Sequence, residues 1–176
     1  RRLALQHLEE LPGWANTVIG DPLSEVHHLD QRVAEYDRHI QHMARTEPTR
    51  QLMRLCGIGE TTATAMIAMV GHGHEFTSGR QFAAWLGLVP RQYSSGGKAR
   101  LGRITKAGDA YLRSLLVQGA RAVIEAAKKK TDSVSRWIQA VEERRGYWRA
   151  VVAMAAKNAR MAWALLQKGE AFKLPA

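Results

Sequence analysis

The chain has 176 residues and a net charge of +10, from 26 lysines and arginines against 16 acidic residues. A hydrophobic content of 45% excludes wholesale disorder, and the basic excess disfavours acidic-tail proteins, calcium buffers and ordinary metabolic enzymes. The single cysteine, Cys56, excludes an internal disulfide framework and a multi-cysteine zinc site, and we expect no metal site. With no membrane-spanning run and no signal peptide, we expect a cytoplasmic protein that does not enter a membrane.

The positive charge is concentrated in one window of the sequence. Residues 80–130 contain 11 basic and 2 acidic residues, a net charge of +9, which leaves +1 for the rest of the chain. Charge that served only solubility would be spread evenly, so the window predicts a contact with nucleic acid. The alternative is a set of ordinary basic surface loops.

The first predicted element is a coiled-coil helix over 21–46. Asp21 and Pro22 are typical of an N-cap and a first helical residue. Apolar residues then alternate at spacings of three and four, which favours pairing with another helix in the same or another chain. An amphipathic helix on its own domain is the alternative. The seam consists of Val26, Leu29, Val33, Tyr36, Ile40 and Met43.

A helix-hairpin-helix is predicted over 52–71. A short helix over 49–56 runs into Gly57-Ile58-Gly59, and an apolar-periodic helix follows. The glycines allow a tight turn, and the second helix would present free backbone N–H groups to a phosphate near Gly57, Gly59 and Thr61. A plain pair of helices with a glycine C-cap explains the pattern equally well.

Residues 87–108 form a long basic, glycine-rich loop. They include five glycines and five basic residues and no acidic residue, so a core helix is excluded and short extended pieces are the most regular structure expected. Within the loop, Ser94-Ser95-Gly-Gly-Lys98 lacks the spacing of a nucleotide-binding P-loop. A serine in such cationic surroundings could attack a phosphodiester, although no base accompanies it, and turn hydrogen bonds are the alternative.

Helices predominate after the loop. Asp109 begins a helix to Ala127, Asp132 caps the next one, and Gly146 precedes the last, in which Trp148 and Trp163 are expected to pack in the core. We therefore predict an all-α fold, with a linker and coiled-coil helix over 1–47 and a helical domain over 48–176. Because the sequence begins at Arg1 without methionine, we expect it to be part of a longer protein.

Four ordered motifs within about 52–127 resemble one known family. They read Gly-Ile-Gly-x-x-Thr-Ala, Phe-x-x-Trp-Leu-Gly-Leu-Val-Pro, Tyr-Ser-Ser-Gly-Gly-Lys and Gly-x-Ile-Thr-Lys-x-Gly-x-x-Tyr-Leu-Arg. This order resembles the C-terminal transposase domain of the insertion-sequence-one-ten family, which is related to the Piv-type DNA invertases. The resemblance implies a bacterial or archaeal DNA recombinase that excises and inserts a mobile element.

The resemblance also implies how such a protein works. Members pair a RuvC-like domain, which binds Mg²⁺ through acidic residues, with a C-terminal domain whose serine is the nucleophile, and many use a guide RNA called a bridge RNA. The serine maps onto Ser95, which directly precedes a glycine, and the coiled coil would support homo-oligomers. Candidate contacts to DNA or guide-RNA phosphates are Arg91, Lys98, Arg100, Arg103, Lys106 and Arg113.

The RuvC-like half is absent from this sequence. We therefore expect this segment alone to hold no cofactor and to bind nucleic acid without recombining it. The competing interpretation is a non-catalytic helix-hairpin-helix module that binds DNA.

Overall fold

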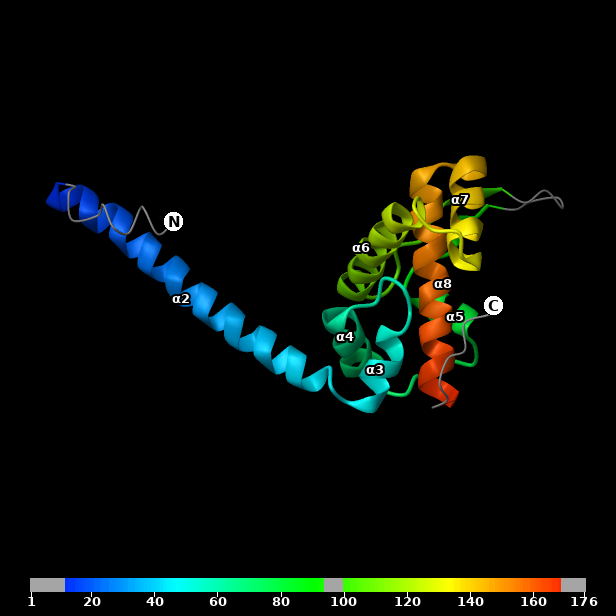
Figure 1. Cartoon of the computed structure of the whole chain (residues 1–176), viewed down its shortest axis with the longest axis horizontal. Coiled ribbons are helices and arrows are strands. Elements are labelled where there is room, and N and C mark those ends of the chain that lie inside the picture. The colour runs from blue at the N-terminus through cyan, green and yellow to red at the C-terminus, as the bar shows by residue number, and fades with distance from the viewer. Residues whose placement is uncertain (1–11, 94–99, 169–176) are drawn as a thin grey trace. The chain divides into compact units, whose positions relative to one another are not determined.

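The computed structural model describes residues 12–93 and 100–168, and helices dominate them (Figure 1). The all-α prediction is thereby confirmed, with one small antiparallel sheet as its exception. The elements are α2 (Gly13–Met43), α3 (Glu47–Met53), α4 (Glu60–Val70), α5 (Gly79–Trp85), β1 (Pro90–Gln92), β2 (Leu101–Ile104), α6 (Ala110–Ala127), α7 (Ser133–Arg145) and α8 (Tyr147–Lys168). None of the described helices is long and apolar enough to cross a membrane.

The chain divides into two compact units, Arg1–His42 and Met43–Ala176. The first contains α2, which begins at Gly13, so the prediction that the helix starts at Asp21 is wrong. Pro22 lies inside the helix, where it removes one backbone hydrogen bond. The upstream residues nevertheless continue the apolar spacing, because Ile19 lies three residues before Pro22, and Pro22 lies four before Val26.

The apolar seam of α2 is exposed to solvent within its unit. Val26, Leu29, Val33 and Tyr36 are between 40% and 58% exposed, and Met43 is 50% exposed. An ordinary amphipathic helix would bury such a stripe against its own domain. The pairing of this seam with a second helix stays a prediction.

In the second unit α8 is the central helix, packed against α3, α5, α6 and α7. Its buried face is rich in alanine, which lets the neighbouring helices approach closely, and α6 contributes a stripe of residues four apart that faces the core. The buried apolar residues of these two helices are Leu112, Leu116, Ala120, Ile124, Ala127, Ala150, Val151, Met154, Ala155, Ala159, Ala162, Leu165 and Leu166.

Three helices of the second unit begin at a side-chain cap. Asp109 and Asp132 cap α6 and α7 as predicted, and Ser78 caps α5; each accepts a backbone N–H bond from the first turn. The short helix expected over 49–56 instead runs from Glu47 to Met53.

The expectation that Trp148 packs in the core is wrong. Its side chain is 65% exposed, whereas Trp163 is half-buried and donates from Nε1 to the carbonyl oxygen of Gly73. The buried stripe of α8 runs through Val151, Met154 and Asn158. Trp148 therefore lies at the edge of that stripe, on the first turn of the helix.

The turn between α3 and α4 touches α6 backbone to backbone. A Cβ atom on Gly57 would lie 2.6 Å from the carbonyl oxygen of Gly119, and a Cβ on Gly119 would overlap the carbonyl oxygen of Gly57. The fully buried Asn158 fixes the same turn, because its Nδ2 donates to the carbonyl oxygen of Cys56 at 2.9 Å. Two helical segments far apart in sequence are joined here.

We predict that Gly119→Ala lowers the free energy of unfolding, by about 1–3 kcal/mol or more, because the added methyl group forces the two backbones apart. The direction of this change is diagnostic, because Gly→Ala inside an unconstrained helix stabilises the protein by up to about 1 kcal/mol. Urea unfolding of the chain measures the free energy of unfolding. Gly59→Ala is the control, because a Cβ on Gly59 meets no atom within 4 Å. Equal stability of the Gly119 variant and the wild type would contradict the packing argument.

Candidate nucleic-acid interface

The long basic segment contains a β-hairpin. Strands β1 and β2 pair antiparallel, with Pro90 opposite Ile104 and Gln92 opposite Leu101, and the register shifts between these pairs. The short extended pieces were expected, but their pairing was not. Every residue of β1 is exposed, and only Ile104 of β2 is partly covered. The strands therefore extend away from the helices into solvent (Figure 1).

The hairpin is closed at its base by close backbone contacts. Thr105 N donates to Val89 O at 2.9 Å, and Lys106 N donates to Gly87 O at 3.1 Å. Gly87, at φ +70°, passes so close that a Cβ there would lie 2.5 Å from Ala107 N. A Cβ on Gly108, at φ +69°, would overlap the carbonyl oxygen of Trp85. Only glycine fits at these two crossings.

Arg113 reinforces this base from helix α6. Its Nη1 donates to the carbonyl oxygens of Ala107 at 2.9 Å and Leu86 at 3.1 Å, and lies 3.4 Å from that of Asp109. A single guanidinium nitrogen thus ties the end of α5 to the segment that follows β2. The structure gives Arg113 a positioning role that the sequence did not suggest, while its contact with a phosphate stays a prediction.

The far end of the stem is also closed. Tyr93 N donates to Arg100 O at 2.8 Å, and the Tyr93 ring lies against Gly102, where a Cβ would be 3.1 Å from Cε2. Residues 94–99, which include Ser94, the predicted nucleophile Ser95 and Lys98, lie outside the described residues. The two residues that flank this segment are held together by a hydrogen bond.

The hairpin presents cations to solvent. Arg91, Arg100, Arg103 and Lys106 are exposed, and within the described ranges none of them forms an ion pair with a carboxylate. The Arg91 guanidinium donates to Thr105 O at 3.3 Å. The structure thus brings four of the predicted phosphate-contacting residues onto one projecting element, which is a positive surface for a polyanion.

The other predicted contacts lie on the turn between α3 and α4. Gly57, at φ +83°, is explained by its packing on Gly119, whereas Gly59 is exposed at φ −95° with open space around its Cα. The first helical hydrogen bond runs from Ala63 N to Gly59 O, and Gly59 has no side chain to cap the preceding amides. Thr61 is exposed beside them, although the acidic Glu60 shares this turn. A phosphate role for Gly59 and Thr61 stays a prediction.

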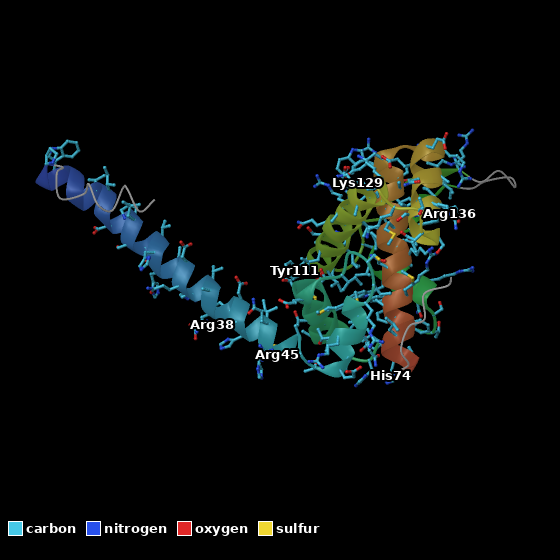
Figure 2. The ribbon with its side chains drawn as sticks, in the orientation of Figure 1. Arg38, Arg45, His74, Tyr111, Lys129 and Arg136 are labelled. Atoms are coloured by element: carbon cyan, nitrogen blue, oxygen red, sulfur yellow. The ribbon has the colours of Figure 1, made fainter. Side chains whose placement is uncertain are left out.

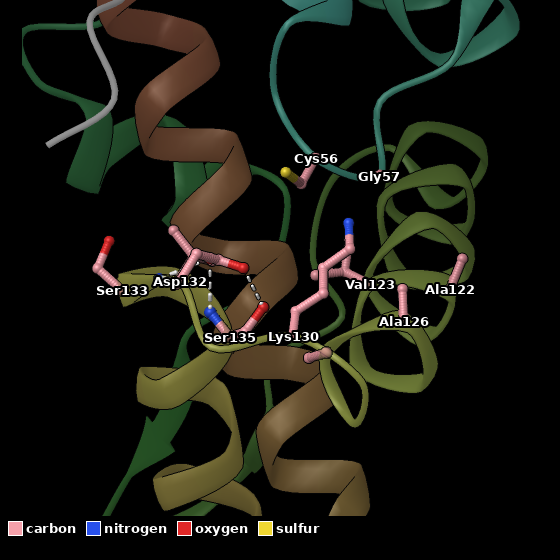
Figure 3. A pocket seen from close by; sticks show the side chains of 11 residues that line it. Cys56, Gly57, Ala122, Val123, Ala126, Lys130, Asp132, Ser133 and Ser135 are labelled. Carbon is pink, nitrogen blue, oxygen red and sulfur yellow. Dashed lines mark hydrogen bonds between the residues drawn. The ribbon is translucent and has the colours of Figure 1, made fainter. Parts of the chain in front are cut away.

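A concavity of about 400 Å³ lies between this turn, the end of α6 and the start of α7 (Figure 3). Its wall is largely apolar, with Cys56, Lys130 and Asp132 among the lining residues. Asp132 accepts from Ser135 Oγ at 2.6 Å and from the amides of Ser135 and Val134, and these bonds lower the pKa of its carboxyl group. Because Asp132 already occupies the amides of α7, we assign no anion to this concavity. No three potential metal ligands converge among the described residues.

Comparison with known proteins identifies the segment that holds the hairpin. Residues 49–135 match the family model described as "Transposase IS116/IS110/IS902 family". This segment is a transposase domain of that family. It begins inside α3 and ends in the first turn of α7, so the α3–α4 turn, the hairpin and Arg113 all belong to it.

Curated relatives carry transposase names. The chain is 44% identical over 164 residues to a "Probable family 20 transposase" of Pseudomonas aeruginosa, covering 93% of the chain and 48% of that relative. It is 42% identical over 151 residues to a "Transposase for insertion sequence element IS1111A" of Coxiella burnetii, covering 85% and 42% respectively. For the "Transposase for insertion sequence element IS1328" of Yersinia enterocolitica the identity is 36%, and the coverages are 82% and 44%. The chain thus spans somewhat under half the length of these relatives.

We predict that Arg113→Ala loosens the base of the hairpin in the transposase domain and lowers the free energy of unfolding by about 1–3 kcal/mol, since the carbonyl oxygens of Leu86 and Ala107 lose a charged donor. Hydrogen exchange at the amides of Thr105 and Lys106 should become faster. Arg103→Ala is the matched control, because Arg103 is exposed on the stem and should leave both quantities unchanged. Unaltered exchange in the Arg113 variant would contradict a positioning role.

Proposed function

We propose that this transposase domain acts on DNA and that Ser95 is the nucleophile that attacks a DNA phosphodiester during excision and insertion of a mobile element. The observation that carries the proposal is the closed stem, in which the Tyr93–Arg100 hydrogen bond joins the ends of the segment that contains Ser95. The hydrogen bond fixes the positions of the two residues that flank this segment, and fixing the groups around a reacting centre lowers the barrier for reaction.

The charge of the stem supports a DNA substrate. Arg91, Arg100, Arg103 and Lys106 flank the serine segment in sequence, are exposed, and are not neutralised by described carboxylates. Arginine and lysine contacts to phosphate position a duplex without reading its sequence. The same cations would stabilise the extra negative charge that develops on the phosphorus centre in the transition state.

The proposed step is a transesterification. Ser95 Oγ loses its proton to a base and forms a bond to phosphorus, while one bridging P–O bond breaks and the released sugar oxygen takes up a proton. The number of phosphate ester bonds is conserved, so the covalent protein–DNA intermediate can be resolved by attack of another DNA hydroxyl without an external energy source.

The base and the metal are proposed to come from a RuvC-like domain in the full-length protein. The donor set of this segment does not fit Mg²⁺, because no three acidic or imidazole side chains converge among the described residues. No step assigned to this segment therefore runs through a metal, and we propose that the segment alone binds DNA without recombining it.

Two partners complete the proposal. A guide RNA would use the same cationic hairpin, because its phosphates carry the same charge as those of DNA. Homo-oligomers would form through α2, whose seam from Val26 to Met43 is exposed and has the spacing of a coiled coil. Pairing of two such seams would bury the apolar side chains that the first unit leaves in solvent.

We predict that Ser95→Ala in the full-length protein abolishes strand exchange while DNA affinity stays within about twofold of the wild type, because the substitution removes only the attacking oxygen. Strand exchange, a gel assay for a covalent protein–DNA adduct, and DNA binding are measured side by side. The adduct should disappear together with exchange.

Ser94→Ala is the matched control and should retain exchange. Normal exchange by the Ser95 variant would refute the assignment, and loss of exchange only in the Ser94 variant would move the nucleophile by one residue. If both variants exchange strands normally, the competing interpretation of a non-catalytic helix-hairpin-helix module is favoured.

A further inference from the structure

Two adjacent aromatic residues, Tyr147 and Trp148, begin α8. Trp148 is 65% exposed although it is among the largest apolar side chains in the protein. Tyr147 meets its ring edge-on, with centroids 5.3 Å apart and planes at 75°. Tyr147 is itself half-buried against the core. The indole of Trp148 is thus accessible to a ligand, with the Tyr147 ring beside it.

One arginine lies over this ring, and others are close to it in sequence. The guanidinium of Arg121, on α6, lies 5.8 Å from the centroid of Trp148. Arg144 and Arg145 end α7, and Arg149 follows Trp148 on α8, all with exposed side chains. The ends of α6 and α7 also bring the carboxylates of Glu125 and Glu142 to this corner. Glu125 is bound by Lys128 at 2.7 Å, and that bond raises the pKa of the lysine.

The corner has a shallow depression beside the ring. Gln118, Arg121, Ala122, Glu125 and Tyr147 line an open volume of about 510 Å³. Lys129 projects near the same end of α6, as Figure 2 shows. The surface therefore combines an exposed aromatic ring, arginines that form no ion pair with a described carboxylate, and room beside them.

We propose that Trp148, supported by Tyr147 and Arg121, stacks on an unpaired base of single-stranded nucleic acid, whose phosphates contact the flanking arginines. Every base offers a π-face to an aromatic ring, and arginines follow the backbone. A protein partner fits less well, since burying four arginines in an apolar interface is costly without matching carboxylates. A fully paired duplex also fits less well, because its bases are stacked on one another.

This inference rests on the proposed function only in that both involve nucleic acid, and it concerns other residues. It assigns the paired DNA to the hairpin and an unpaired stretch, of DNA or of RNA, to the corner between α7 and α8. The two surfaces would then hold different parts of one nucleic-acid assembly.

The test measures binding of the whole 176-residue chain to fluorescently labelled (dT)20, (rU)20 and a 20-base-pair duplex by fluorescence anisotropy. Trp148→Ala should weaken single-strand binding about tenfold, as loss of one stacked base does, and change duplex binding less than about twofold. Trp148→Phe should restore most of the affinity. Trp14→Ala is the control, because Trp14 is 75% exposed on α2 and should have no effect.

The outcomes of this test do not depend on whether Ser95 is the nucleophile. A loss confined to (dT)20 or to (rU)20 supports it and identifies the strand as DNA or RNA. Unchanged single-strand affinity in Trp148→Ala, an equal loss on the duplex, or a wild-type chain that binds neither single strand overturns it. A thermal unfolding curve identical to that of the wild type establishes that the variant is folded. Failure of Ser95→Ala to stop strand exchange would refute the nucleophile and leave this inference intact.

Discussion

The backbone crossing at the base of the hairpin is the constraint on which the rest of the site depends. Gly87 lies against Ala107, Gly108 lies against Trp85, and neither place has room for a Cβ atom. The end of α5 and the start of α6 are thus held together, and both helices pack into the core around α8. A thin, solvent-exposed hairpin has little packing of its own and would be marginal in isolation. The helices therefore determine the geometry of the hairpin, through these backbone contacts and through the hydrogen bonds of Arg113.

Local signals predicted the helices of the second unit well. The caps Ser78, Asp109 and Asp132 act within one helical turn, so the residues that decide them are adjacent in sequence. The features that the sequence did not predict depend on contacts between residues far apart in the sequence. The contact between Gly57 and Gly119 joins segments more than sixty residues apart. Trp148 has the apolar spacing of a core residue, but the packing partners of α8 decide which edge of the stripe stays in solvent. The strands of the hairpin are exposed on both faces and carry no alternating pattern that could have revealed their pairing.

The segment that holds the transposase-like motifs contains residues of two kinds. Gly87, Gly108 and Arg113 have roles that the structure accounts for, because they build the base of the hairpin. Arg100 and Arg103 have no structural role of that kind, since their side chains reach solvent from the stem. Both kinds of residue lie within residues 49–135, which match the transposase family model. The sequence alone could not separate the residues that build the hairpin base from those exposed for a contact, because arginine occurs in both groups.

The salt dependence of duplex binding by the double variant Arg100→Ala/Arg103→Ala tests most directly whether the hairpin is the DNA-contacting element. Each lost phosphate contact should reduce the slope of log affinity against log salt by about 0.9, so the double variant should be shallower than the wild type by about 1.8. Arg38→Ala on α2, whose guanidinium donates to the carbonyl oxygen of Ala34, is the control. A slope equal to that of the wild type would show that DNA does not touch the stem and would contradict the proposed contact between the hairpin and DNA.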